Sequence, residues 1–188
     1  MANFPVIIDA CVLVQAAVRD TLLRLAERRL FICRWTDEII DEVVGVLKNR
    51  LQRSPEQIEH LTSELRTYFA DAWVESGYKL LVPAMSNDLK DRHVLAAAVK
   101  GGCEVIVTYN IRHFPKEALA PLDVEAMTPD EFLLGLYFLS PEIVVHELHE
   151  QGAALKEKKS LAQVLASLEI CQCQKFAALI REKHNLST

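Results

Sequence analysis

The chain has 188 residues, of which 51% are hydrophobic and 25% charged, and its formal net charge is −5. These values are typical of one globular domain with an appendage, and they exclude a basic field over the whole surface, so that a nucleic-acid ligand would need a local patch. The five cysteines are an odd, scattered set, which favours free thiols in a reducing cytosol. Asp9 interrupts the apolar N-terminal run, and we expect neither a targeting signal nor a membrane span.

Short apolar segments alternate with helical patterns in the first two thirds of the chain. The predicted strands cover residues 5–9, 30–34, 78–83 and 104–109, with a weak fifth within 123–127. Helices are predicted over 11–29, after the N-cap Thr36, after Ser54 and over 92–100, where two glycines supply the left-handed end. This alternation predicts a parallel sheet covered by helices on both faces.

From about residue 129 the pattern becomes helical without strands. The predicted helices cover residues 129–138, 141–156, 160–169 and 172–185. We therefore expect a domain over 1–130 and a C-terminal helical extension over 131–188. Two apolar stripes in the extension, Leu161–Leu168 and Phe176–Ile180, fit two alternatives: a contact with another protein, or packing on the domain itself.

Four polar residues lie just past an apolar run or in the opening turns of a helix. They are Asp9, Glu42, Asp91 and Asn110. Parallel α/β sheets collect function where strands end and helices begin, so these side chains are candidates for one site. Three carboxylates and an amide make a hard-oxygen site that suits Mg²⁺ or Mn²⁺, and hence metal-assisted phosphoryl chemistry. The alternatives are structural: Asp9 as an N-cap and Glu42 as a solvated helix acid.

Further residues are predicted to lie beside this set. Asp88 and Asp91 are three residues apart and would share one face in the first turn of a helix, where both also suit the helix dipole. Thr108 and Asn110 flank Tyr109 at the end of a predicted strand, so alternation places both on one side. The following residues put Arg112 and His113 at the rim of the expected site, where a phosphate could pass.

Two other motifs are weaker. The "HELHE" segment at 146–150 has its histidines three residues apart rather than four, so a surface helix is the better interpretation than a zinc protease motif. Cys171 and Cys173 form a C-x-C pair without a second pair nearby, which favours two small residues on a helix over a zinc site.

The joint pattern resembles the PIN-domain nucleases. It consists of "IIDACVLV", an acid on the second helix, and "DLKDRHVLAAAVKGGCEVIVTYNIRHFP", and it covers about residues 5–130. Within that family it is most similar to the bacterial VapC-like toxin ribonucleases. The family's acids map onto Asp9, Glu42 and Asp91, with Asp88 as an auxiliary ligand. The chain departs from the family at Asn110, where a fourth acid would fall, and at Cys11, where an Asn is frequent.

The resemblance implies a three-layer α/β/α PIN-like fold with a central parallel sheet of four to five strands. It also implies a cytoplasmic, Mg²⁺- or Mn²⁺-dependent endoribonuclease, the toxin of a type II toxin–antitoxin system, that forms a homodimer and is silenced by a cognate antitoxin. The expected catalytic residues are Asp9, Glu42, Asp91, Asn110 and Thr108. The alternative is a PIN-like domain with little catalysis that binds RNA or a protein, and the two departures and the acidic net charge favour it.

Overall fold

The computed structural model describes residues 4–186, which fold around a parallel sheet. Its strands are ordered β2-β1-β3-β4 and are all parallel. Their bounds are β1 (Pro5–Ile8), β2 (Ile32–Arg34), β3 (Val105–Val107) and β4 (Glu125–Met127). The predicted parallel α/β class is confirmed, and the weak strand within 123–127 is present as β4.

The predicted strand over 78–83 is wrong. That segment forms short 3₁₀ turns over Ser76–Leu80 and Val82–Ala84. At the β2 edge of the sheet, residues 72–74 already pair with the backbone of Trp35, whose N–H donates to the Ala72 carbonyl at 3.0 Å. The apolar residues of this segment do not share one buried face: Tyr78 is buried, whereas Leu80 is exposed.

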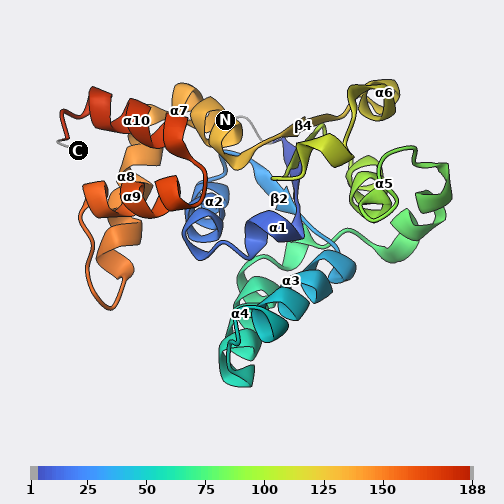
Figure 1. The fold of residues 1–188 in the computed structure, drawn as a ribbon, viewed down its shortest axis with the longest axis horizontal. Helices are drawn as coiled ribbons and strands as arrows, with labels where there is room; N and C mark the ends of the chain where they lie inside the picture. Colours follow the sequence, from blue (N-terminus) through green and yellow to red (C-terminus); the bar gives the residue numbers. More distant parts are fainter. Residues whose placement is uncertain (1–3, 187–188) are drawn as a thin grey trace.

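Helices cover both faces of the sheet, which gives three layers (Figure 1). The predicted helix over 11–29 divides into α1 (Ala10–Leu13) and α2 (Ala16–Glu27). On the opposite side lies α5 (Arg92–Lys100), whose consecutive alanines at 96–98 are completely buried and let it approach the strands closely. The helix ends at Gly101, and Gly102 has a φ of 63°, so the predicted left-handed ending is confirmed.

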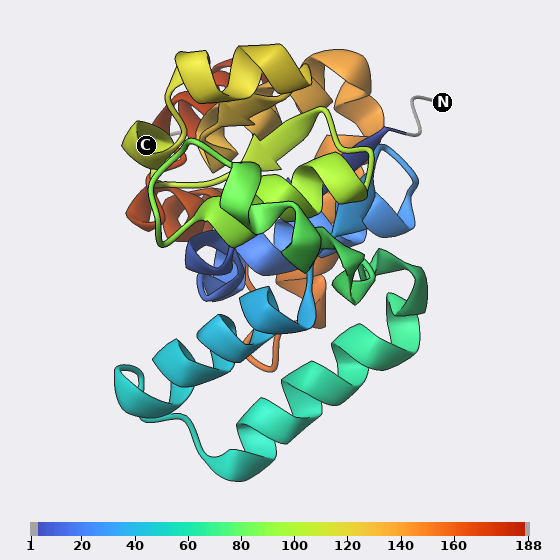
Figure 2. The ribbon, with the colours of Figure 1, turned by 90° about the vertical axis from the view of Figure 1, so that its right-hand side faces the viewer.

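An α-helical hairpin projects from this body (Figure 2). It consists of α3 (Asp37–Asn49) and α4 (Pro55–Tyr68). The Thr36 side chain accepts a hydrogen bond from Ile39 N, which confirms its predicted role as an N-cap, and Ser54 forms a capping box with Gln57. The two helices are anchored unequally, because α3 buries four apolar side chains and α4 buries only Leu65.

The short α6 (Lys116–Leu119) lies between β3 and β4, and the described chain after β4 consists of helices. They are α7 (Pro129–Leu139), α8 (Pro141–Ala154), α9 (Leu161–Ile170) and α10 (Gln174–Lys183). In Figure 1 they gather beside α2, and α8 and α9 both contact it. The apolar residues of the Leu161–Leu168 stripe are buried within the chain, as are Phe176 and Ile180. Both stripes are therefore covered by this chain: α9 packs on α8 and α2, and α10 packs on α7 and α9.

Polar contacts tie the C-terminal helices to the rest of the chain. The Thr21 hydroxyl donates to Gln151 Oε1 at 2.6 Å, and the Tyr109 hydroxyl donates to the Cys171 carbonyl at 2.6 Å. Glu147 of the "HELHE" segment is buried and pairs with Arg28, so this acid has a structural partner rather than a metal. Among the described residues, no helix is long and apolar enough to cross a membrane.

The C-x-C pair lies in the turn between α9 and α10, not on a helix as predicted. Cys171 is the C-cap of α9 and Cys173 is the N-cap of α10. Cys173 is completely buried, so its thiol is part of the packing of this turn.

Candidate metal site at the strand ends

The carboxyl ends of the neighbouring strands β1 and β3 bring the first predicted residues together. Asp9 follows β1, and Thr108 follows β3. The Thr108 hydroxyl donates to Asp9 Oδ2 at 2.6 Å and accepts from Asn110 N at 3.0 Å. Asp9 is 2% exposed and occupies the N-cap position of α1, yet its side chain makes no capping hydrogen bond. Helix capping therefore does not account for this buried carboxylate.

Helices α3 and α5 complete the site from the other side. Glu42 lies on α3 and Asp91 precedes α5, and together with Asp9 and Asn110 they line one cavity of about 420 Å³. The structure thus brings together four of the residues that were predicted to form the site, with Thr108 directly behind Asp9. The side chain of Glu42 is 45% exposed, so the cavity is open to solvent on the side of the α3–α4 hairpin.

The carboxylates of this cavity disfavour each other's charge. Burial raises the pKa of Glu42, and the negative charges of Asp9 and Asp91 raise it further, against the opposing effect of His93. Burial also raises the pKa of Asp91; the hydrogen bond from His113 lowers it, and the charge of Asp9 raises it. A bound cation would offset this repulsion.

The side chains present fit a divalent cation. Their donor set is made of carboxylate and amide oxygens, which Mg²⁺ and Mn²⁺ prefer. A buried polar atom also lacks a partner here: His93 Nε2 makes no hydrogen bond with the described residues, although it lies 3.5 Å from Glu42 Oε1. Sequence reasoning missed His93, whose only signal is its position two residues after Asp91.

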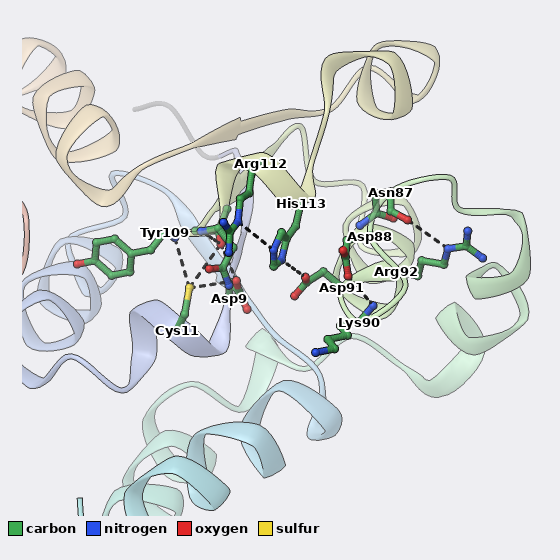
Figure 3. Close-up of polar contacts among 12 residues, drawn as sticks. Asp9, Cys11, Asn87, Asp88, Lys90, Asp91, Arg92, Tyr109, Arg112 and His113 are labelled. Atoms are coloured by element: carbon green, nitrogen blue, oxygen red, sulfur yellow. Dashed lines mark hydrogen bonds and ion pairs between the residues drawn. The ribbon is translucent and has the colours of Figure 1, made fainter. Parts of the chain in front are cut away.

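Asp88 does not line the cavity, although it was predicted to share the first turn of a helix with Asp91. Helix α5 begins at Arg92, so Asp91 is its N-cap residue and Asp88 lies in the preceding loop, where its Oδ1 accepts from Lys90 N at 3.0 Å. The expectation of a shared first turn is therefore wrong. The loop nevertheless turns Asp88 toward Asp91 and His113, and His113 Nδ1 lies 2.6 Å from Asp91 Oδ2 (Figure 3).

Cys11 supports Asp9 as a neutral donor. Its Sγ donates to Asp9 Oδ2 at 3.1 Å and accepts from Tyr109 N at 3.3 Å (Figure 3). Burial, helped by the charge of Asp9, raises the pKa of the Cys11 thiol to about 12, so this group stays protonated at neutral pH. The thiol can thus hold Asp9 in place without adding charge to the site.

The raised pKa values predict how the metal-free protein responds to pH. In the unfolded chain the pKa values of Glu42 and Asp91 are about 4, and in the folded protein both are higher. At a pH between the unfolded-state and the folded-state values, the folded protein therefore binds more protons than the unfolded chain. Their contribution to stability is fully present below about pH 4 and is lost as the pH rises through the folded-state values.

Urea unfolding between pH 4 and 7, in the presence of a metal chelator, measures this pH dependence of the free energy of unfolding. The variant Asp9→Asn should lose less stability over that range than the wild type, because the charge of Asp9 raises both pKa values. Equal pH dependence of the two proteins would contradict the prediction.

Known proteins resemble this chain in two consecutive regions. A family model described as PIN domain matches residues 5–112, which is more than half of the chain, and a model described as VapC50 C-terminal domain matches residues 129–182. The chain is also 59% identical over 58 residues to the protein named "Putative ribonuclease VapC50" of Mycobacterium tuberculosis (strain ATCC 25618 / H37Rv). That match spans 31% of this chain and 34% of the relative's length.

Proposed function

The chain belongs to the PIN-domain family, and from the donor set of its strand-end cavity we propose that it is a divalent-metal-dependent endoribonuclease. The observation that carries the proposal is the meeting of Asp9, Glu42 and Asp91, which come from three separate segments, around one open cavity. The repulsion among these three carboxylates does not stabilise the fold. A divalent cation bound between them would offset it.

Each residue has a role in this proposal. Asp9, Glu42 and Asp91 would hold Mg²⁺ or Mn²⁺, and Asn110 would orient a water or add a neutral ligand. Thr108 and Cys11 act through Asp9, because both donate hydrogen bonds to its Oδ2 and fix its orientation. When bound, the divalent ion supplies a Lewis acid for the phosphate and lowers the pKa of a water.

A local basic rim supports a phosphodiester substrate despite the negative net charge. Arg50 lines the cavity itself. Lys90 and Arg112 are exposed and lie close to Asp91 and His113 in the close-up (Figure 3). We infer that these cationic side chains contact the phosphates of the RNA backbone. Such contacts supply the salt-dependent part of nucleic-acid affinity.

The cellular role is inferred from likeness. The C-terminal helices match the VapC50 C-terminal domain, and VapC50 is named a putative ribonuclease. We infer that the chain acts in the cytoplasm as the toxin of a type II toxin–antitoxin pair, as a homodimer whose activity a cognate antitoxin silences.

Cleavage of a mixed-sequence RNA by the purified protein tests the proposed activity. We expect cleavage with Mg²⁺ or Mn²⁺ and none in EDTA. RNA binding without cleavage under either ion would favour the alternative of a catalytically weak PIN-like domain.

Restoring the missing acid should strengthen the site. Asn110→Asp adds an anionic ligand to the cavity, so we expect the apparent Mn²⁺ affinity to rise about tenfold. Calorimetric titration of Mn²⁺ measures the change.

Asn49→Asp is the matched control, since Asn49 lines the same cavity from the end of α3 but not at the strand end. An equal gain in both variants would mean that the added charge acts at a distance, and that Asn110 is not a ligand.

A further inference from the structure

A second group of metal-binding side chains lies beside the strand-end cavity. Asp88, Asp91 and His113 each offer one ligand atom, and these atoms all lie within 4.8 Å of one another. The group shares only Asp91 with the carboxylate cluster, because neither Asp88 nor His113 lines that cavity. It also differs in chemistry, because it contains an imidazole nitrogen.

The backbone holds this group in position. His113 ends the 3₁₀ turn Ile111–His113 that follows β3, and its carbonyl accepts from Asp88 N at 3.1 Å. Asp91 N donates to the Asp88 carbonyl at 3.0 Å, so both acids lie on one tight turn. The side chain of Asp91 makes no capping bond to α5 and turns instead to His113 (Figure 3). These contacts hold the three side chains close together before any ion binds.

An unsatisfied polar side chain marks the same turn. Asn87 is 4% exposed, and neither its amide nitrogen nor its amide oxygen has a hydrogen-bond partner among the described residues. In the close-up it lies beside Asp88 (Figure 3). Buried amides are normally paired, so this one calls for a partner such as a water on a bound ion. Asp88 is exposed, which leaves the site a path to solvent.

The donor set selects a borderline transition ion. One imidazole nitrogen with two carboxylate oxygens and an open position suits Zn²⁺, whereas Mg²⁺ prefers oxygen ligands alone. Ligand atoms of a tetrahedral zinc site lie about 3.4 Å apart. The Asp91–His113 contact of 2.6 Å would therefore open by less than about 1 Å, with loss or transfer of the Nδ1 proton.

We propose that Asp88, Asp91 and His113 bind Zn²⁺, and that Zn²⁺ at this site withdraws Asp91 from the cluster with Asp9 and Glu42. The zinc site stands on its own geometry, whereas its inhibitory consequence rests on the proposed nuclease function. Zinc thus competes with the activating ion for one shared carboxylate.

Direct zinc binding tests the site without any activity measurement. We expect competition with a chromophoric chelator to show at least a tenfold weaker Zn²⁺ affinity for His113→Ala and for Asp88→Asn, both checked for wild-type circular dichroism and melting. His149→Ala removes an exposed histidine of α8 and serves as the matched control, with wild-type affinity. Unchanged affinity in His113→Ala would overturn the proposal. So would a loss of zinc binding in Asp9→Asn but not in His113→Ala, which would place zinc in the carboxylate cluster.

Inhibition tests the consequence. The Zn²⁺ concentration that halves Mg²⁺-supported RNA cleavage should rise at least tenfold in Asp88→Asn relative to the wild type. The two hypotheses fail separately. If no ion supports cleavage while zinc binding still depends on His113, the nuclease function is wrong and the site stands. If Mg²⁺ supports cleavage and zinc inhibits both proteins equally, zinc acts elsewhere and the inhibitory role is wrong.

Discussion

Asp9→Asn is expected to reduce metal-dependent RNA cleavage by about 100-fold or more, while the protein remains folded. Loss of a residue that merely orients a ligand costs about 10–100-fold in metal affinity or activity, and loss of a direct ligand should cost at least as much. The change preserves shape, and the amide oxygen can still accept from Thr108 and Cys11. The rate of RNA cleavage at saturating Mn²⁺ measures the loss of activity. Titration of the same samples with Mn²⁺ measures the loss of metal affinity.

The matched control is Asp41→Asn, an exposed acid of α3 next to Glu42. It removes the same charge without touching the cavity, so its cleavage rate should equal that of the wild type. A well-folded Asp9→Asn protein that cleaves RNA at the wild-type rate would refute the assignment of Asp9 as a ligand.

Phe176→Ala is expected to lower the free energy of unfolding by about 3–5 kcal/mol. Phe176 is completely buried on α10, in the face that packs within the C-terminal helices, and its removal leaves a cavity there. Its backbone N–H donates to Asp130 Oδ1 at 2.8 Å, so the neighbouring backbone is held in place and cannot easily collapse into the space. Urea unfolding of the full chain measures the loss.

Phe138→Ala is the control, since Phe138 belongs to the same helical region but is 71% exposed. It should change stability by less than about 0.5 kcal/mol. A small effect of Phe176→Ala would mean that the C-terminal helices are a loosely attached appendage. By the same reasoning, a chain cut before Ser160 should unfold rather than become a smaller stable enzyme, because α2 and α8 would lose their apolar cover.

The parts of the site that follow strands could be predicted from the sequence. Asp9, Thr108 and Asn110 meet because β1 and β3 are adjacent and parallel, and the carboxyl ends of parallel strands always meet at one edge. Glu42 was harder, because it stands among other acids of α3. Its position three residues from the buried Ile39 places it at the margin of the apolar face, and the structure puts it there.

The remaining features depend on contacts that no local pattern encodes. The segment 78–83 has strand-like composition, but the backbone beside β2 is already taken by residues 72–74, so the tertiary structure overrides the propensity. The meeting of His113 with Asp91 likewise depends on how a 3₁₀ turn after β3 faces the loop before α5. Sequence analysis placed His113 at the rim without its partner for that reason.

The unequal anchoring of the helical hairpin has a consequence for local opening of the folded protein. Local opening costs least where few apolar side chains are buried, so the amide hydrogens of α4, which buries only Leu65, should exchange with solvent well before those of α3. Glu42 lies on α3, and a cation shared between Glu42 and the body of the protein would clamp this helix down. The ion would then slow hydrogen exchange along α3 while leaving the outer end of α4 nearly as labile as before.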